Sequence, residues 1–523
     1  MFNSRYAWPM RNEHILIIGS GFAGLGLGIR LKQAGIEDFT ILEQADDVGG
    51  TWRDNTYPGA ACDVQSHLYC YSFEPNPNWS RSFAPQREIL DYLRHCADKY
   101  DVRKHIRFGT QVLGAKFDEG AGLWELTTNH GSFRGRVLTF ATGGLSRPSL
   151  PDIAGRDTFQ GPAFHSARWE KGASFEGKTV GVIGTGASAI QIVPELARDA
   201  KRLVLFQRTA PWVLPKPDYP IPKEQRERLA RSPFLQWFER ASLYMRLEAR
   251  LLAILKRPQL MSHAERMAIR FIEANISDPA LRKKLVPNYR MGCKRILMSN
   301  EYYAALARPN VEVVTDGIDS ISSRGIVGRD GREHAVDTIV YATGFQVSEA
   351  VAPFPIVGKN GVNLQEQWAD GAEAYRGATV PGFPNLFFVG GPNTGLSHSS
   401  MIFMLESLMN YVVDAVQTMR REGIDQVSVK PEVAKQFNRE LQSRFSGTVW
   451  ASGCRSWYQA KNGNNVALWP GFTFDFRRMT RRFDLPNYEA TRREPLGRGA
   501  ADPRATKPAG APRESAVTVA SSS

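Results

Sequence analysis

The sequence predicts an α/β protein with two Rossmann-like dinucleotide-binding domains and a helical insertion. Two observations carry this prediction. Residues 14–48 and residues 178–208 each follow the order strand, glycine-rich turn, helix, strand. Each unit is followed by a strand that ends in Ala-Thr-Gly, in VLTFATGG at 137–144 and TIVYATGF at 338–345. A chain of 523 residues also exceeds what one hydrophobic core usually holds.

In the first unit, Gly19, Gly21 and Gly24 fit the pattern GxGxxG. The first glycine permits the tight turn, and the second lets the backbone approach a pyrophosphate at the helix N-terminus. Glu43 ends the next strand, where a carboxylate can accept hydrogen bonds from ribose hydroxyls. We therefore expect a dinucleotide at this unit.

In the second unit, Gly184, Gly186 and Ala189 fit the GxGxxG/A variant. The strand end carries Arg208 and then Thr209 instead of an acid. A cation there suits a ribose 2′-phosphate, which favours NADPH over NADH. The alternative is an arginine that only caps a strand edge. One acidic and one basic site together suggest FAD at the first unit and NADPH at the second.

The rest of the chain completes two interleaved domains. Residues 222–290 are rich in helix formers with apolar residues at helical spacing, and we expect that stripe to be core rather than a membrane-binding face. NLFFVGGPN at 385–393 predicts a buried strand and turn, and a helix is expected at about 399–420. The expected division is an FAD-binding domain at 1–146 and 346–488, an NADP-binding domain at 150–214 and 294–345, a helical insertion at 215–293, and a disordered tail at 489–523.

Composition limits the other possibilities. No apolar run approaches the ~20 residues of a membrane span, and no signal-peptide pattern begins the chain. The net charge of +13 comes from basic residues spread along the chain, so we expect a basic surface rather than a nucleic-acid partner. No CxxC occurs, which argues against a zinc site or a redox dithiol and suits a cytoplasmic protein. The five cysteines are Cys62, Cys70, Cys96, Cys293 and Cys454.

Four further motifs occur in order along the chain. FQGPAFHSARW at 159–169 fits FxGxxxHxxxW, and GCKRILMSNEYYAALARPNV contains Lys294 and Arg295. SWYQAKNGNN contains Trp457. The remaining motif, GxWxxxxYPGxxxD, is matched by Gly50, Trp52, Tyr57, Pro58, Gly59 and Asp63.

With these motifs the sequence resembles the type I Baeyer–Villiger monooxygenases, a branch of the class B flavoprotein monooxygenases. The resemblance covers roughly residues 12–480, and Glu170 departs from the Pro or Asp common in the family. It implies that NADPH reduces FAD, that O2 forms a flavin 4a-peroxide, and that this species inserts one oxygen into a ketone. The product is an ester or a lactone.

The resemblance also implies roles for single residues. Arg295 matches the catalytic arginine, and Asp63 matches the acid that pairs with it. Lys294 is expected to join Arg208 and Thr209 at the 2′-phosphate, and Trp457 to contact the nicotinamide-side ribose. Two interpretations of Trp52, as core and as flavin contact, stay open. The motif histidine, His165, is expected to be a linker residue rather than a general base.

Three other functions compete. A flavin-containing monooxygenase that oxidises nitrogen or sulfur would not need Asp63 with Arg295. A disulfide reductase is disfavoured by the missing CxxC, and a non-catalytic NADPH sensor would not use reduced flavin productively. The residues do not name the ketone. The stretches LSHSSMIFMLES and NNVALWPGF are expected to shape the pocket, with a preference for linear or modestly bulky ketones.

Overall fold

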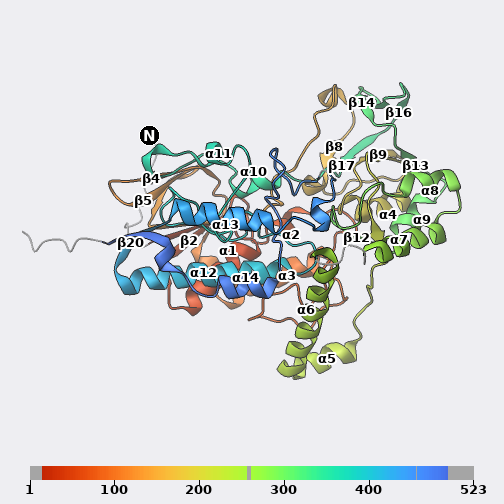
Figure 1. Cartoon of the computed structure of the whole chain (residues 1–523). Coiled ribbons are helices and arrows are strands. Elements are labelled where there is room, and N and C mark those ends of the chain that lie inside the picture. The colour runs from red at the N-terminus through yellow and green to blue at the C-terminus, as the bar shows by residue number, and fades with distance from the viewer. Residues whose placement is uncertain (1–13, 256–260, 455, 493–523) are drawn as a thin grey trace, which may run out of the picture.

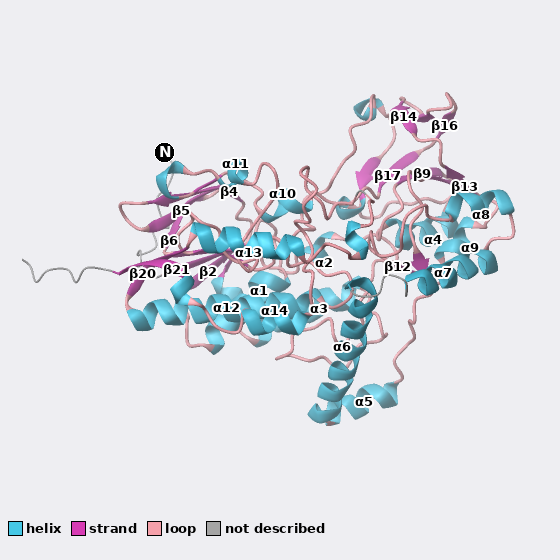
Figure 2. Ribbon diagram, in the orientation of Figure 1, coloured by secondary structure: helices cyan, strands magenta, loops and turns pink. Residues whose placement is uncertain are grey.

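The computed structural model describes residues 14–255, 261–454 and 456–492. Its framework is two five-stranded parallel sheets (Figure 2). The first sheet has the order β19-β7-β1-β2-β3. Its strands are β1 (Ile15–Ile18), β2 (Phe39–Leu42), β3 (Ile106–Arg107), β7 (Val137–Phe140) and β19 (Leu386–Phe388).

The second sheet repeats the plan of the first. Its order is β13-β10-β9-β17-β8, so each Ala-Thr-Gly strand, β7 or β17, pairs with the strand that begins its own unit. Its strands are β8 (Ala163–His165), β9 (Thr179–Ile183), β10 (Arg202–Phe206), β13 (Val311–Val314) and β17 (Thr338–Tyr341). The predicted fold class, two Rossmann-like units in one α/β chain, is confirmed.

Two smaller sheets of three and four strands, built on antiparallel pairs, accompany the large ones. The first contains β4 (Val112–Asp118), β5 (Leu123–Thr128) and β6 (Gly131–Gly135), extended by β18 (Ile356–Val357). The second contains β14 (Ile318–Ile321), β15 (Gly325–Gly328) and β16 (Glu333–Ala335). Each follows the outer strand of its parallel sheet and precedes the Ala-Thr-Gly strand, so the internal repeat extends beyond the two fingerprints.

Helix α1 (Phe22–Gln33) packs closely on α12 (Met401–Glu422) beside the first sheet. A Cβ at Gly26 would lie 2.5 Å from the Met409 Cε, so this glycine lets the two helices approach. Other helices beside the first sheet are α3 (Gln86–Lys99), α13 (Pro431–Ser443) and α14 (Thr473–Met479). The second sheet carries α4 (Ala189–Asp199) and α9 (Tyr302–Leu306).

The helices of the predicted insertion divide into two groups (Figure 1). Helices α7 (Met261–Asn275) and α8 (Pro279–Leu285) lie beside the second sheet. Helices α5 (Lys223–Arg231) and α6 (Pro233–Leu255) project from the body, and α6 buries Leu243 and Leu247 in the core of the first domain. No described helix is long and apolar enough to cross a membrane.

The expectation that the apolar stripe of the insertion is core is wrong for part of α6. Phe234, Trp237, Phe238 and Met245 have exposed fractions of 66%, 62%, 58% and 64%. The reason is that α6 docks through only part of its surface, and helical spacing of apolar residues does not distinguish the docked part from the free one.

The predicted start of the disordered tail is also wrong by a few residues. Strand β21 (Tyr488–Arg492) pairs antiparallel with β20 (Ile424–Val429). The residues of β21 after Tyr488 are exposed, so the strand is held by backbone pairing with β20 and not by burial of apolar side chains. Composition alone therefore did not predict this strand. Residues 493–523 lie outside the described residues.

The fold also joins two of the cysteines. Cys293 and Cys454 form a disulfide across 161 residues of sequence, with their Cα atoms 6.3 Å apart. Cys62, Cys70 and Cys96 are free and buried. The absence of CxxC argued against a redox dithiol and gave no information about a disulfide between distant cysteines, because tertiary contact and not local spacing brings this pair together. The disulfide removes one support for the expected cytoplasmic location.

We predict that Cys293→Ser lowers the melting temperature, because opening the long loop frees the unfolded chain, an effect of about 2–4 kcal/mol. Cys454→Ser should lower it equally. The double variant should be no worse than either single variant, since one bond is lost only once. Thermal unfolding under non-reducing conditions measures all three, and additive losses would show that the two thiols act separately.

Candidate active site

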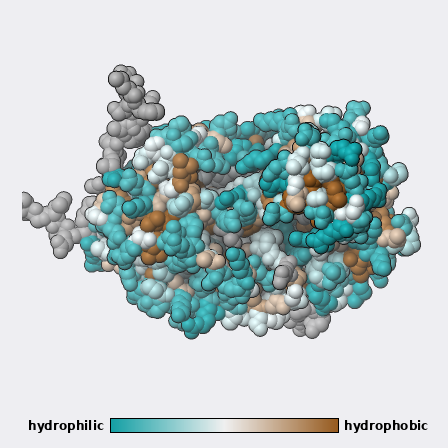
Figure 3. Space-filling model, turned by 90° about the horizontal axis from the view of Figure 1, so that it is seen from above, coloured by the Kyte–Doolittle hydropathy of each residue, from teal (hydrophilic) through white to brown (hydrophobic). Residues whose placement is uncertain are grey.

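A cavity of about 1570 Å³ lies where the carboxyl ends of the two parallel sheets face each other. Both glycine-rich turns, both Ala-Thr-Gly turns and loops from the C-terminal half line it. Figure 3 shows a hollow between the two halves of a mostly hydrophilic face. Ligands of open α/β sheets bind at this edge, so one cavity can serve both nucleotide sites.

The first glycine-rich turn leaves room only on the cavity side. A Cβ at Gly24 would lie 1.9 Å from the Gly19 oxygen, and one at Gly19 would lie 2.8 Å from the Ala141 oxygen. A Cβ at Gly21 meets only Gly50, at 3.6 Å, an ordinary contact. Gly21 is thus not required by protein packing, and its missing side chain leaves space for a ligand at the start of α1.

Glu43 is 4% exposed and fully engaged. It accepts hydrogen bonds from the Ser20 backbone N–H at 2.9 Å, the Ser20 hydroxyl at 2.8 Å and the Ala45 N–H at 3.0 Å. The Arg53 Nη1 lies 3.0 Å from the Glu43 Oε1, the oxygen that also accepts the Ala45 N–H. A carboxylate offers about four acceptor positions, so a ribose hydroxyl would bind after the Ser20 hydroxyl rotates away. Sequence reasoning missed Arg53, although it follows the motif tryptophan directly.

The loop after the first fingerprint contributes Gly50 and Trp52. Gly50, at φ +50°, precedes the short helix α2 (Thr51–Asp54) and brings its backbone close to Gly21. The Trp52 indole N–H donates to the Tyr69 hydroxyl at 3.2 Å, and the two rings meet edge to face at 5.6 Å. Trp52 packs against the core and also lines the cavity, so both interpretations describe part of its surroundings.

The Tyr-Pro-Gly turn holds the first domain against the second. The Tyr57 hydroxyl donates to the Gln191 side-chain oxygen at 2.8 Å, and the Gln191 amide donates to the Ala61 carbonyl at 2.9 Å. A Cβ at Gly59 would lie 2.7 Å from the Gln191 carbonyl oxygen, so this glycine permits the contact. Gln191 lies in α4 and was not predicted, because its partner is distant in sequence.

In the second glycine-rich turn, as in the first, close backbone packing requires one glycine and another leaves space on the cavity side. Gly184 has φ +109°, and a Cβ there would lie 2.4 Å from the Ala342 oxygen. Gly186 has no protein atom within 4 Å of its Cβ position, so it opens to the cavity as Gly21 does. Ala189 begins α4. The Thr209 carbonyl accepts a hydrogen bond from the Thr185 hydroxyl at 2.8 Å.

A smaller pocket beside this turn collects positive charge. Arg208 and Lys294 both line it, and its described lining contains no carboxylate. The Lys294 ammonium lies 4.8 Å from the centroid of the Tyr289 ring. Burial and the repulsion of Arg208 lower the pKa of Lys294. The other lining residues are Thr209, Asn288, Gly453 and Cys454. Two cations that repel each other favour a bound dianion between them.

Asp63 and Arg295 meet in the main cavity. The Arg295 Nε donates to the Asp63 Oδ2 at 2.8 Å, and Nη2 donates to the same oxygen at 2.5 Å. Nη1 reaches the Leu396 carbonyl at 3.4 Å. The attraction of Asp63, opposed by desolvation, raises the pKa of Arg295 further above its ordinary value. Three of the five guanidinium N–H groups are used, so two remain for a ligand.

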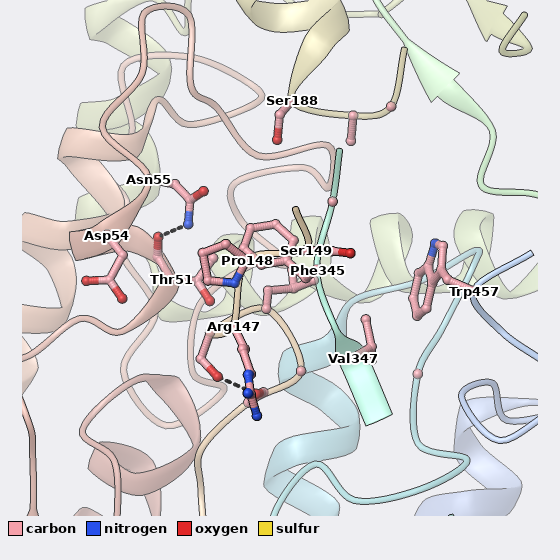
Figure 4. A pocket seen from close by; sticks show the side chains of 18 of the residues that line it. Thr51, Asp54, Asn55, Arg147, Pro148, Ser149, Ser188, Phe345, Val347 and Trp457 are labelled. Atoms are coloured by element: carbon pink, nitrogen blue, oxygen red, sulfur yellow. Dashed lines mark hydrogen bonds between the residues drawn. The ribbon is translucent and has the colours of Figure 1, made fainter. Parts of the chain in front are cut away.

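Trp457 and His165 lie in contrasting positions. Trp457 is 49% exposed and lines the cavity, across from Asn55 and Asp54 in Figure 4. His165 is buried at the end of β8, outside the described cavity lining, and its Nδ1 accepts the Ala167 N–H at 3.1 Å. Burial lowers the pKa of His165 to about 4. A histidine so placed suits an interdomain linker more than proton transfer.

Apolar side chains form one wall of the cavity. They come from the two stretches singled out in the sequence, one of which forms the turn before α12 and its first turns. Asp63 and Arg295 line the same cavity as this wall. The apolar wall residues are Leu396, Met401, Ile402, Leu405, Val466 and Leu468.

Comparisons with known proteins agree with this arrangement. The model of the flavin-binding monooxygenase-like family matches residues 12–366. The chain is 46% identical to a Baeyer–Villiger monooxygenase of Pseudomonas aeruginosa, over 92% of each chain. It is also 46% identical to one of Streptomyces coelicolor, over 94% of this chain and 95% of that one.

Solved structures show the same likeness. OTEMO in complex with FAD and NADP aligns with a TM-score of 0.84 and 30% identity, over 92% of this chain and 99% of that one. A closed cyclohexanone monooxygenase aligns with a TM-score of 0.82 and 27% identity, over 92% and 100%. With this match over nearly the whole chain, and with two nucleotide turns, an anion pocket and an Asp–Arg pair around one cavity, the chain belongs to the Baeyer–Villiger branch of the flavin-binding monooxygenase-like family.

Proposed function

We propose that this enzyme uses NADPH, FAD and O2 to insert one oxygen atom into a ketone, giving an ester or a lactone. The observation that carries the proposal is the Asp63–Arg295 pair, which lies in the same cavity as both glycine-rich turns. A flavin-containing monooxygenase acting on nitrogen or sulfur would not need this pair. Bound FAD, once reduced by NADPH, supplies the activation of O2.

The two cofactors are assigned by the shape and charge of their sites. Gly21 and Gly50 leave the space at the start of α1 that an FAD pyrophosphate needs. Arg208 and Lys294 supply the cations for the 2′-phosphate of NADPH. Trp457, exposed in the cavity, would contact the nicotinamide-side ribose.

Arg295 has the chemistry that ketone oxidation requires. Negative charge develops on oxygen during the reaction, and a guanidinium keeps its proton throughout. Asp63 fixes the guanidinium through Nε and Nη2, so donors already oriented face the cavity. The apolar wall beside the pair would hold the hydrocarbon part of the ketone and exclude water.

The domain division stays part of the proposal. FAD-binding segments at 1–146 and 346–488 would enclose NADP-binding segments at 150–214 and 294–345, with 215–293 inserted. The structure supports it through β19 (Leu386–Phe388), which joins the first sheet, and β13 and β17, which join the second. A cytoplasmic location, where NADPH is available, remains a prediction.

The direct test is NADPH-dependent O2 consumption by the purified enzyme across linear, cyclic and aryl ketones, with products identified by mass. We expect esters or lactones sixteen mass units heavier than the ketones, as addition of one oxygen atom requires. Oxidation of amines and sulfides without any ketone product would favour the flavin-containing monooxygenase alternative.

We predict that Gly21→Val yields protein without FAD, because the new side chain points into the space left for the pyrophosphate. Gly114→Val is the matched control, since the Cβ position at Gly114 has one protein contact, at 3.9 Å, and lies outside the described cavity lining. The visible absorption of purified protein measures bound flavin. A yellow Gly21→Val protein with full flavin content would contradict the FAD assignment.

Arg208→Ala should raise KM for NADPH and leave KM for NADH nearly unchanged. A charge-assisted contact with phosphate is worth about 1.5–3 kcal/mol, or roughly 10- to 100-fold. Lys294→Ala should act in the same direction. Arg198→Ala, a half-exposed arginine on α4 outside the described pocket lining, controls for net charge. Equal losses with both cofactors would mean that Arg208 only supports the strand end.

Arg295→Ala should retain FAD and still accept hydride from NADPH, but form almost no ester. Losing an oriented donor to a developing oxyanion costs about 10²–10³ in turnover. Asp63→Ala should be milder in ester formation and should also slow flavin reduction. Because one ion pair is lost only once, the double variant should be no worse than Arg295→Ala. Stopped-flow reduction and product analysis separate the steps, and multiplicative losses would show that the residues act independently.

A further inference from the structure

The outer face of α6 carries an apolar stripe that the proposed reaction does not use. Phe234, Trp237, Phe238, Met245 and Leu252 have exposed fractions between 45% and 66%. The spacing places them on one side of the helix, over about 27 Å at 1.5 Å per residue. The stripe lies outside the described cavity lining. An exposed apolar stripe of this length, with three aromatic side chains at one end, marks an interaction surface.

Helix α6 is anchored to the first domain, in part along the edge of the stripe itself, so the stripe is presented on a fixed support. Tyr244 stacks on Phe403 with ring centroids 4.9 Å apart. Buried Glu248 bonds His398 at 3.2 Å and accepts the Thr473 N–H at 2.9 Å. These contacts tie α6, which projects from the body of the molecule in Figure 1, to the first domain.

The charges around the stripe distinguish between partners. From Lys223 to Leu252, five basic side chains are exposed against two acidic ones. The basic ones are Lys223, Arg228, Arg231, Arg246 and Arg250, and the acidic ones are Glu224 and Glu227. A second copy of the chain would bring these excess positive charges together, and the whole chain already carries a net charge of +13. An anionic surface complements them.

We propose that this face of α6 binds the surface of an anionic lipid bilayer. Trp and Phe side chains favour the boundary between headgroups and acyl chains, and arginines beside them attract anionic headgroups. An amphipathic helix of this composition lies in the plane of the interface. Ketones of low polarity concentrate in the same layer, so attachment brings the enzyme to its substrates without altering the cavity.

The test uses the full-length FAD-bound enzyme in sedimentation with two kinds of vesicle. One is phosphatidylcholine alone, and the other is phosphatidylcholine mixed with phosphatidylglycerol. We expect binding to the mixed vesicles at low ionic strength, weaker binding as salt screens the arginines, and little binding to the neutral vesicles. Absence of binding to the mixed vesicles at low salt would overturn the proposal.

Two variants locate the surface. The triple variant Phe234→Ser, Trp237→Ser, Phe238→Ser and the double variant Arg231→Glu, Arg246→Glu should each reduce the vesicle partition coefficient by about tenfold or more. Leu113→Ser, which removes a half-exposed leucine from β4, should bind as the wild type does. Unchanged binding by the triple variant would overturn the proposal.

Two further measurements distinguish membrane binding by this surface from misfolding of the variants and from dimer formation. All variants should keep the wild-type melting temperature and the wild-type rate with a small ketone dissolved in buffer, since the changed side chains are exposed and outside the described cavity lining. Light scattering of the wild type should show no concentration-dependent dimer that the triple variant abolishes. Such a dimer would assign the stripe to a second copy of the chain instead.

Discussion

The ion pair between Asp63 and Arg295 depends on the relative position of the two domains, and so does the geometry of the site. Asp63 follows the first fingerprint, whereas Arg295 stands 232 residues later. Each side chain is about one-third exposed, so the pair is partly desolvated. Replacing one of the two residues would therefore leave the other charge unpaired in a partly desolvated position. The Tyr57–Gln191 bond and the disulfide at Cys293 restrain the segments that carry the pair.

The charge balance of the cavity links the basic pocket of Arg208 and Lys294 with the Asp–Arg pair. Arg208, Lys294 and Arg295 are close along the cavity wall, and Asp63 neutralises only one of them. Burial, and after it the repulsion of Arg208, lower the pKa of Lys294. A bound phosphate dianion removes that repulsion, so binding should stabilise the folded enzyme as well as fill the site. In the proposed function, the sequence order Lys294–Arg295 thus places the cation for the phosphate and the cation for the reacting oxygen on adjacent residues.

Local patterns predicted the features that depend on local geometry. Gly19, Gly21 and Gly24 were identifiable because a tight turn beside a helix needs glycine at fixed spacing, and the two sheets follow from the repeated units. The Asp63–Arg295 pair came from resemblance to a family, since no spacing rule joins residues so far apart. Gln191 and the Cys293–Cys454 bond were missed for the same reason. Strand β21 was missed because backbone pairing holds it, and composition carries no signal of that.

Helix α6 shows which structural features the periodicity of apolar residues predicts and which it does not. Apolar residues at helical spacing establish that a helix has apolar faces, but burial depends on what the rest of the chain places against each face. Here Leu243 and Leu247 enter the core, while Phe234 and Phe238, on the same helix, remain exposed. Glu248, three residues after Met245 and four before Leu252, is buried against His398, so the docked contacts reach the edge of the exposed stripe toward the C-terminal end of α6. Burial along α6 therefore depends on which segments of the chain lie opposite each turn, and the helical position of a residue does not predict it.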